Sequence, residues 1–318
     1  MKFGLSTLTR GLLTTREAYQ AVAKAAEAAG FDFLAVSDHV VVPAHLKSAY
    51  PYTAGGVFGA AEHGHCFEQL ATIAFLAGCT ERLRLLTSVL VVPHRPPILA
   101  AKLLATIDVL SNGRLIVGAG AGWMQEEFAL LGLPFETRGS ATDEYLEAFR
   151  ELWTKDRPAY SGKHVRFSDI LFYPKPLQKP HPPIWIGGES PAALRRAIRL
   201  ADAWYPGNNS QQRPLDTPER LAVAIAEIRA ACEGAGRDPA LLGISLLVQN
   251  PFEWSAHKTQ DGRQRRLFTG SSTEMQADAR ALSRLGVGHV AVRLGGDTVE
   301  DAVARIQQFG AEVIAPSL

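Results

Sequence analysis

Short apolar runs alternate with amphipathic stretches along almost the whole chain. The runs are rich in Val, Ile and Leu without strict polar alternation, which is typical of strands that are covered on both faces. Strands that alternate with helices form βαβ units, and such units build a parallel sheet. The runs that we expect to be strands are Lys2–Leu8, Phe33–Ser37, Leu83–Val91, Leu115–Ala119, Pro183–Gly187, Ala203–Tyr205, Gly243–Val248 and His289–Arg293.

The amphipathic stretches between these runs are expected to be helices, and some carry clear start signals. Thr14 with Glu17, and Ser271 with Glu274, have the spacing of a capping box, in which each side chain bonds the other residue's backbone N–H. The expected helices are Thr15–Ala29, Glu68–Ala77, Pro97–Leu110, Asp143–Trp153, Pro191–Leu200, Pro218–Glu233, Thr273–Leu285 and Val299–Gly310.

Eight strands that alternate with eight helices predict an α/β fold, a closed (β/α)8 TIM barrel. A chain of 318 residues with 47% hydrophobic content suits one barrel domain over residues 1–318, with two ordinary domains as the competing count. Three stretches are too long for ordinary connections, and we expect them to build a pocket wall or lid at the C-terminal face. These insertions are Val40–His65, Lys155–Lys179 and Gln249–Ser272. The insertion Lys155–Lys179 could form a small β-hairpin.

The charges are balanced, with 33 Lys and Arg against 32 Asp and Glu, and no basic segment predicts nucleic acid or anionic lipid as a partner. No apolar run approaches the roughly 18 residues that span a bilayer. The N-terminal MKFGLSTLTR lacks the apolar core of a secretory signal. Cys66, Cys79 and Cys232 match no zinc or redox spacing, so we expect buried thiols and a cytoplasmic location.

Functional residues of a barrel gather where its strands end, at the C-terminal face. The second expected strand is followed by Asp38 and His39. The His39 imidazole could donate a hydrogen bond to a cofactor or exchange a proton near neutral pH. The alternative is a purely structural role, in which Asp38 caps a turn and the His39 ring only forms hydrogen bonds with neighbouring groups.

Glycines mark the ends of the fourth and fifth expected strands. The fourth continues as Gly120-Ala121-Gly122-Trp123, where alternate glycines let a planar ring or a phosphate approach the backbone, without Rossmann or Walker spacing. The fifth continues as Gly187-Gly188-Glu189-Ser190 and enters a helix directly. Two glycines, a hydroxyl cap and a helix N-terminus predict a phosphate cradle of backbone N–H groups, with a plain helix cap as the alternative. Glu189 fits this cradle only if its carboxylate points to solvent.

One further pattern is typical of metal-dependent barrel hydrolases. His63 and His65, together with His45 and Asp38, have suitable ligand types, but the His-x-His pair lies in a long insertion rather than at the first strand's end. We therefore expect no metal. The nucleophile motif Gly-x-Ser-x-Gly is also absent from the sequence.

Taken together, these segments resemble the luciferase-like monooxygenase superfamily, most of all its branch of coenzyme F420-dependent oxidoreductases. The resemblance covers about Lys2 to Tyr205, and the C-terminal third matches only in its rhythm of strands and helices. The matching motifs are Ser37-Asp38-His39, Ala101-Lys102, Asp108-Val109-Leu110-Ser111-Asn112-Gly113-Arg114, Val117-Gly118-Ala119-Gly120-Ala121-Gly122-Trp123, Glu127-Phe128, Leu131-Gly132, Arg138-Gly139, Asp143-Glu144, Leu152-Trp153, Pro174-Lys175-Pro176 and Pro182-Pro183-Ile184-Trp185-Ile186-Gly187-Gly188.

The resemblance implies that a flavin or deazaflavin ring lies in the barrel mouth. His39 would lie near this ring, and Asp38 would position the His39 side chain. Ser88 and Val89 would correspond to a bulge that presses on the ring's face, in this family often as a non-proline cis peptide. The segment Gly187–Ser190 would hold the cofactor phosphate, and Gly120–Trp123 would line the cofactor's tail or ring.

The implied reaction is hydride transfer between F420 and a small organic substrate. Sugar-phosphate dehydrogenases of this branch carry a glutamate soon after the fourth-strand glycine, where this chain has Ala121-Gly122-Trp123. We therefore expect an apolar or aromatic substrate rather than a sugar phosphate. The aromatic residues that favour it are Trp123, Phe58, Tyr50, Tyr52 and Trp254.

Three other functions stay open at this point. The first is an FMN-dependent monooxygenase, which would need a flavin reductase as a partner. The others are a metal-dependent barrel hydrolase and a non-catalytic flavin-binding homologue. Because related barrels often dimerise, a homodimer is among the expected assemblies.

Overall fold

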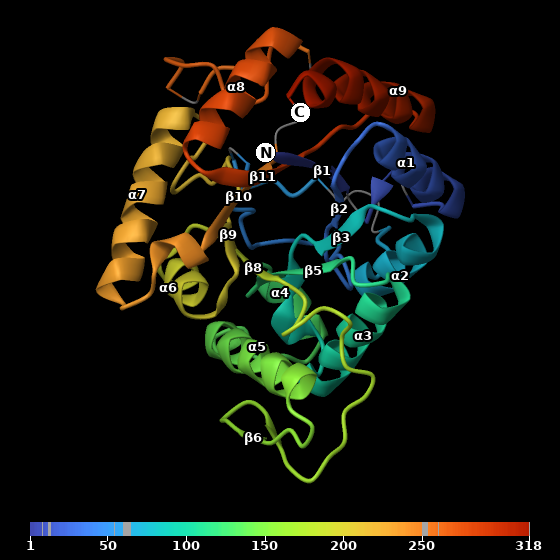
Figure 1. The fold of residues 1–318 in the computed structure, drawn as a ribbon, viewed down its shortest axis with the longest axis vertical. Coiled ribbons are helices and arrows are strands. Elements are labelled where there is room, and N and C mark those ends of the chain that lie inside the picture. Colours follow the sequence, from blue (N-terminus) through green and yellow to red (C-terminus); the bar gives the residue numbers. More distant parts are fainter. Residues whose placement is uncertain are drawn as a thin grey trace.

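Within the described residues, eight parallel strands close into a barrel that helices surround (Figure 1). The computed structural model describes residues 1–7, 9–11, 14–53, 55–59, 65–249, 254–259 and 261–317. The barrel order is β1-β2-β3-β5-β8-β9-β10-β11, and pairing of β1 with β11 and of β3 with β5 closes it. The predicted (β/α)8 fold is therefore confirmed. The barrel strands are β1 (Lys2–Thr7), β2 (Phe33–Val36), β3 (Arg84–Thr87), β5 (Leu115–Gly120), β8 (Ile184–Gly187), β9 (Ala203–Tyr205), β10 (Gly243–Val248) and β11 (Val287–Val292).

The helices lie outside the barrel and mostly match the predicted ranges. They are α1 (Arg16–Ala28), α2 (Gln69–Cys79), α3 (Pro97–Leu110), α4 (Gln125–Leu130), α5 (Arg138–Thr154), α6 (Pro191–Leu200), α7 (Pro218–Gly234), α8 (Ser272–Arg284) and α9 (Val299–Phe309). Short helical turns are η2 (Val92–His94), η3 (Pro239–Leu241), η4 (Gly310–Ile314) and η5 (Ala315–Ser317). The short α4 went unpredicted because six residues carry too little periodicity to reveal a helix.

Two helix starts test the capping predictions. The capping box of Ser271 and Glu274 is present at α8. At α1 the prediction was wrong, because the N-cap is Thr15, whose side chain accepts from Ala18 N at 3.1 Å. The Thr14 hydroxyl instead donates to the Gly11 carbonyl at 2.7 Å. Neighbouring threonines offer the same cap chemistry, and the path of the preceding loop decides which one is used.

The third predicted strand is interrupted. After β3, the Ser88–Val89 peptide is cis, and the strand resumes as β4 (Leu90–Val91). The pairing with β5 shifts across this break: Leu86 pairs with Ile116 before it, whereas Leu90 pairs with Ala119 after it. The expected bulge is therefore present, and it turns the Ser88–Val89 step toward the barrel mouth.

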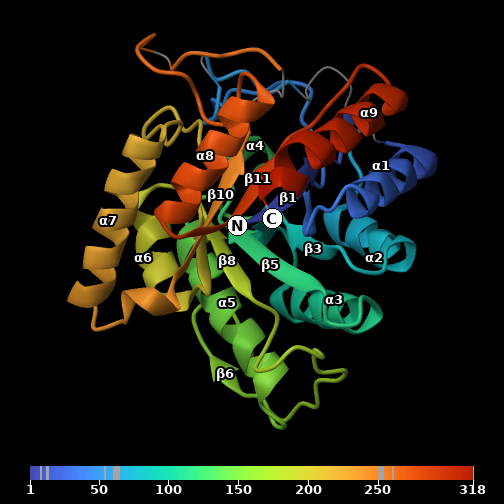
Figure 2. The same cartoon turned by 45° about the horizontal axis from the view of Figure 1, so that its top comes forward.

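The insertion at 155–179 lies at the opposite end from the one predicted. It connects α5 to β8 and contains the antiparallel pair β6 (Tyr160–Ser161) and β7 (Arg166–Phe167), which confirms the hairpin. Gln178 near its end donates to the carbonyl of Leu115, the first residue of β5, at 2.7 Å. Figure 2 shows β6 at one end of the molecule and the loop before α8 at the other. A connection from a helix to the next strand starts and ends at the N-terminal face. The turn of the hairpin runs back along α5, where the Ser140 hydroxyl lies 2.8 Å from His164 Nε2.

Some expectations fall partly outside the described residues, which exclude Leu8 at the end of the first predicted strand. None of the described helices is long and apolar enough to cross a membrane. The three cysteines are free thiols, but only Cys232 is buried, whereas Cys66 and Cys79 are half-buried.

Candidate active site

A cavity of about 780 Å³ opens at the C-terminal ends of the barrel strands. It brings together the sequence-predicted site residues from four separate strand ends, with one exception, Glu189. The predicted residues that line it are Asp38, His39, Ser88, Val89, Gly120, Ala121, Gly122, Trp123, Gly187, Gly188 and Ser190. A cavity of this size can hold a cofactor and a small substrate together.

Val89 forms part of the cavity floor, and two glycines leave room for it. Its side chain packs on the buried residues that fill the barrel interior, among them Trp185 and Tyr205. A Cβ atom at Gly120 would lie 2.7 Å from Val89 Cγ2, and one at Gly187 would lie 2.9 Å from Val89 Cγ1. These glycines are thus needed for the bulge itself, and not only for a ligand. The Ser88 hydroxyl beside it lies 3.1 Å from the Tyr205 hydroxyl.

His39 is held by Glu127, a residue that the sequence analysis did not select. The His39 Nδ1 atom lies 2.8 Å from a carboxylate oxygen of Glu127, whose side chain is only 1% exposed. The other oxygen accepts from Val40 N at 2.7 Å and from Val41 N at 3.2 Å. Burial would raise the pKa of Glu127, but the hydrogen bonds and the nearby imidazoles outweigh it and lower this pKa. A charged carboxylate therefore fixes the orientation of the imidazole and leaves Nε2 for a ligand.

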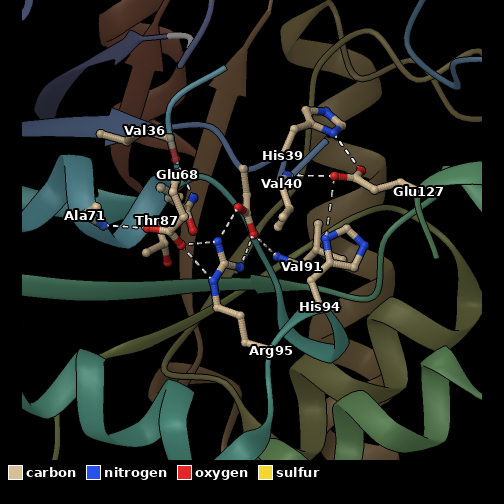
Figure 3. A network of polar contacts seen from close by, with 12 residues as sticks. Val36, His39, Val40, Glu68, Ala71, Thr87, Val91, His94, Arg95 and Glu127 are labelled. Atoms are coloured by element: carbon tan, nitrogen blue, oxygen red, sulfur yellow. Dashed lines mark hydrogen bonds and ion pairs between the residues drawn. The ribbon is translucent and has the colours of Figure 1, made fainter. Parts of the chain in front are cut away.

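A second histidine lies on the other side of the same carboxylate. Figure 3 shows Glu127 between His39 and His94, and His94 Nδ1 is 4.0 Å from Glu127 Oε1. Its ring packs edge-on against Phe128, with 4.7 Å between centroids. Neither ring nitrogen of His94 has a hydrogen-bond partner among the described residues. Burial lowers the pKa of His94, so its neutral form is favoured in this apolar position.

Asp38 does not touch His39, which corrects its predicted positioning role. Its two oxygens accept from Arg95 at 2.8 Å each, and one also accepts from Val91 N at 2.9 Å. Arg95 in turn binds Glu68, the N-cap of α2 (Figure 3). Asp38 therefore ties the end of β2 to β4 and α2, although part of it still lines the cavity.

The segment predicted to cradle a phosphate leads from β8 into α6 and caps that helix. Gly188 has a φ of +100°, and the Ser190 hydroxyl accepts from Ala193 N at 3.2 Å at the start of α6. Arg138 and Gly139 at the start of α5 also line the cavity. Two helix N-termini and a guanidinium thus face this region, an arrangement that favours an anion.

Glu189 points away from the cradle, but not into solvent as the sequence reasoning required. It is buried and accepts a hydrogen bond from Gly207 N. Burial raises the pKa of Glu189 to about 7, against the opposing effect of the Gly207 hydrogen bond. A carboxyl group that is turned away and partly protonated near pH 7 weakens the repulsion that a phosphate would otherwise meet.

An aromatic wall faces the histidine. Phe58 lies 4.9 Å from His39, 5.2 Å from Tyr50 and 5.3 Å from Trp123, measured between ring centroids. Tyr50, Tyr52, Phe58 and Trp123 line the cavity as predicted. Trp254 does not, because it packs at the edge of the main hydrophobic core.

The described residues of the hydrolase pattern give no sign of a metal site. His45 and His65 are exposed, and Asp38 is bound to Arg95. Within the described part of the chain no group of three or more possible metal ligands is found. His63 lies outside the described residues.

Three further cavity residues carried no predicted role, although two of them stand in the motifs that resemble the family. Glu127, His94 and Arg138 all line the cavity. Glu127 stands four residues after Trp123 in a Glu-Glu pair, which by itself is typical of an exposed helix start. Its burial against His39 is the only sign of its role.

Comparisons with known proteins agree with this geometry. The family model described as luciferase-like monooxygenase matches residues 1–260. An uncharacterised protein of Mycobacterium tuberculosis is 37% identical over 223 residues, which cover 69% of this chain and 73% of that protein. The FMNH2-dependent dimethylsulfone monooxygenase of Pseudomonas putida is 33% identical over 230 residues, or 71% of this chain and 56% of that enzyme.

A solved structure has the same fold. The coenzyme F420-dependent tetrahydromethanopterin reductase from Methanopyrus kandleri superposes with a TM-score of 0.76 at 18% identity, covering 100% of this chain and 99% of that one. The barrel, the bulge after β3 and the match over residues 1–260 lead to one conclusion. The chain belongs to the luciferase-like monooxygenase family and is an oxidoreductase or monooxygenase of that family.

Proposed function

We propose that the chain transfers a hydride between the deazaflavin coenzyme F420 and a small organic substrate. One observation carries the proposal: His39, anchored by Glu127, shares a cavity with the Ser88–Val89 step and with the anion-favouring start of α6. A cofactor with a planar ring and a phosphate needs both a flat apolar support and an anion site, and this cavity contains both.

The residues fit such a cofactor. Val89 rises between Gly120 and Gly187 and offers an apolar surface on which a ring can rest. Backbone N–H groups at the start of α6, together with Arg138, would hold the phosphate. When bound, the deazaflavin supplies the hydride chemistry, and the protein supplies binding and orientation.

His39 acts on the substrate in this proposal. Its Nδ1 is engaged by the Glu127 carboxylate, so Nε2 is the nitrogen that faces the cavity's contents. From there it donates a hydrogen bond to the substrate oxygen, or takes up the proton that leaves it in the reverse direction. The aromatic wall of Tyr50, Phe58 and Trp123 excludes water from this point.

An FMN-dependent monooxygenase is the second candidate. The 33% identity to the FMNH2-dependent dimethylsulfone monooxygenase favours it. The same cradle and apolar support would then hold reduced FMN, and a flavin reductase would supply it.

Cofactor titrations separate the two candidates. The purified protein is titrated with oxidised F420 and, in parallel, with FMN, by fluorescence. We expect saturable F420 binding that is at least tenfold tighter than FMN binding, and anaerobic turnover with reduced F420. Tight FMN binding with oxygen uptake in the presence of a flavin reductase would replace this proposal by the monooxygenase.

A further inference from the structure

Two arginines that line the cavity have no negative partner among the described residues. Arg10 follows β1 and Arg293 follows β11, two adjacent strands of the barrel. Both are half-buried. Among the described residues, neither guanidinium forms an ion pair or a hydrogen bond, and Arg10 only lies over the ring of Phe58, at 4.4 Å from its centroid.

The other described arginines of the cavity are engaged. Arg196 binds Asp143 at 2.6 Å, and Arg266 lies 3.6 Å from Asp216. Arg138 donates to the carbonyls of Gly122 and Phe135. Among the described arginines of the cavity, only Arg10 and Arg293 have neither a hydrogen bond nor an ion pair with a described residue.

The pair lies across the barrel mouth from the phosphate cradle. In the closed order β1-β2-β3-β5-β8-β9-β10-β11, the strand opposite β1 is β8, and the strand opposite β11 is β5. Arg10 thus faces the β8–α6 cradle, and Arg293 faces the end of β5. A cofactor whose phosphate occupies the cradle and whose ring rests on Val89 leaves the two arginines to a second ligand.

Unpaired guanidinium groups in a cavity are unfavourable unless a ligand compensates them. Partial burial removes hydration, and two like charges nearby repel each other. Desolvation is the main cause that lowers the pKa of both arginines, and for Arg10 the positive charge of Arg293 acts in the same direction. Arginine forks match carboxylate and other oxyanions with paired N–H donors.

The surroundings indicate what is attached to the anion. Tyr50 lies near both arginines, since both act electrostatically on its hydroxyl. Tyr50 also packs against Trp123 and Phe58, and Phe58 packs against His39. The path from the arginine pair to His39 is therefore walled by aromatic rings, which suits an apolar or aromatic body.

We propose that the substrate is an organic acid, whose carboxylate or sulfonate group binds between Arg10 and Arg293 while its apolar body lies along Tyr50, Phe58 and Trp123. The reacting carbon then lies toward His39. This inference rests on the proposed function only in treating the ligand as the substrate. It adds an anionic group to the apolar or aromatic substrate expected from the sequence.

Ligand titrations test the proposal with size-matched probes. Benzoate, benzenesulfonate and neutral benzamide are titrated into the wild-type protein by calorimetry, with and without F420. We expect both anions to bind at least tenfold more tightly than benzamide, and to lose affinity as salt rises. Equal binding of benzamide, or binding that salt does not affect, would overturn the proposal.

Substitutions locate the site. Arg10→Gln and Arg293→Gln are each expected to weaken benzoate binding about tenfold or more while leaving benzamide unchanged, since a charge-assisted hydrogen bond is lost. Arg157→Gln is the matched control, because Arg157 is exposed and lies in the insertion at 155–179. Arg293→Lys keeps the charge without the fork and serves if a glutamine variant does not fold; it should weaken benzoate binding less.

Two further readouts keep the proposals apart. If the glutamine variants lose affinity for F420 instead of benzoate, the arginines hold the cofactor and the inference is wrong. If wild-type protein fails to bind F420 but still selects benzoate through these arginines, the cofactor assignment fails and the anion site stands. Inorganic phosphate is a further probe. Its binding should depend on the cradle residues and should be unchanged in the Arg10→Gln variant.

Discussion

Single residues decide the chemistry of the cavity, and Glu127 is the clearest case. Its carboxylate is buried, charged and bonded to the His39 ring and to two backbone N–H groups. It therefore acts through His39 as a positioning residue. Asp38, the neighbour that the sequence suggested for this role, instead accepts hydrogen bonds from Val91 N and from Arg95.

Replacement of Glu127 should affect turnover more than binding. Glu127→Gln keeps the size but removes the charge facing the imidazole, so we expect kcat to fall by about 10- to 100-fold with little change in KM. The pH dependence of kcat should also change, which a purely structural role would not cause. Glu233→Gln, at an exposed glutamate of α7, is the control and should retain normal kinetics. An unaltered pH profile in E127Q would contradict the assignment.

Glu189 should make stability depend on pH. Its pKa is raised from an ordinary 4.5 to about 7 in the folded state, so the folded chain favours the protonated form. This contribution is complete below about pH 4.5 and is lost as the pH rises through 7, with an upper limit of roughly 3 kcal/mol. Urea unfolding at pH 5 and pH 8 measures it. Glu189→Gln should lose less stability than wild type between these values; an identical loss in both proteins would refute the role.

At the scale of elements, ion pairs and close packing join the strand ends into one rigid rim. Arg95 links Asp38 after β2 with Glu68 at the start of α2, and Val91 in β4 bonds the same aspartate. Val89 fits between Gly120 of β5 and Gly187 of β8. The cavity floor thus depends on contacts between elements that are distant in sequence.

Loss of Arg95 should destabilise the fold strongly. Arg95→Met leaves the Asp38 carboxylate buried without its partner, which typically costs about 3–5 kcal/mol of unfolding free energy. The control is Arg84→Met, which breaks a more exposed pair with Asp32 and should cost about 1 kcal/mol or less. Denaturant unfolding measures both. Similar losses in the two variants would show that the buried pair has no special weight.

The fit of Val89 can be tested by a double-mutant cycle. Gly187→Ala should cost about 1–3 kcal/mol, because its new Cβ would lie only 2.9 Å from Val89 Cγ1. In a Val89→Ala background this loss should become much smaller, since the clashing methyl group is gone. Additive losses would mean that the glycine is needed for some other reason.

At the scale of the whole molecule, the candidate site and the β6–β7 insertion connect to opposite ends of the barrel strands. The cavity opens at the C-terminal ends of the strands, whereas β6 lies beside α5 at the other end of the molecule (Figure 2). The two anion-favouring regions, the α6 cradle and the Arg10–Arg293 pair, lie on opposite sides of one mouth. In our proposal the cofactor binds on one side of this mouth and an acidic substrate on the other.

Changes in the insertion should therefore affect stability alone. Tyr160→Phe removes a 2.6 Å hydrogen bond to Glu147 and should cost about 1 kcal/mol. The affinities for F420 and for benzoate should stay at wild-type values. A tenfold change in either affinity would place the insertion in contact with the site, contrary to the topology.

The sequence alone determined the architecture and the places where function gathers. Strands and helices follow from local apolar patterns and caps. In a barrel, the residues that follow each strand lie at the C-terminal face. Asp38, His39, Gly120 and Gly187 can therefore be selected from their positions in the sequence, whereas Ser88 was implied only by the family resemblance. These features depend on residues close in sequence, which is why they can be read directly.

Only the tertiary structure decided which charges meet. His39 and Glu127 are 88 residues apart, and Arg95 reaches Asp38 across 57. It also decided that Glu189 turns away from the cradle, and that Arg10 and Arg293 have no described partner. Side-chain pairing depends on barrel closure and on burial, since a charge is satisfied or left unpaired only when distant elements enclose it.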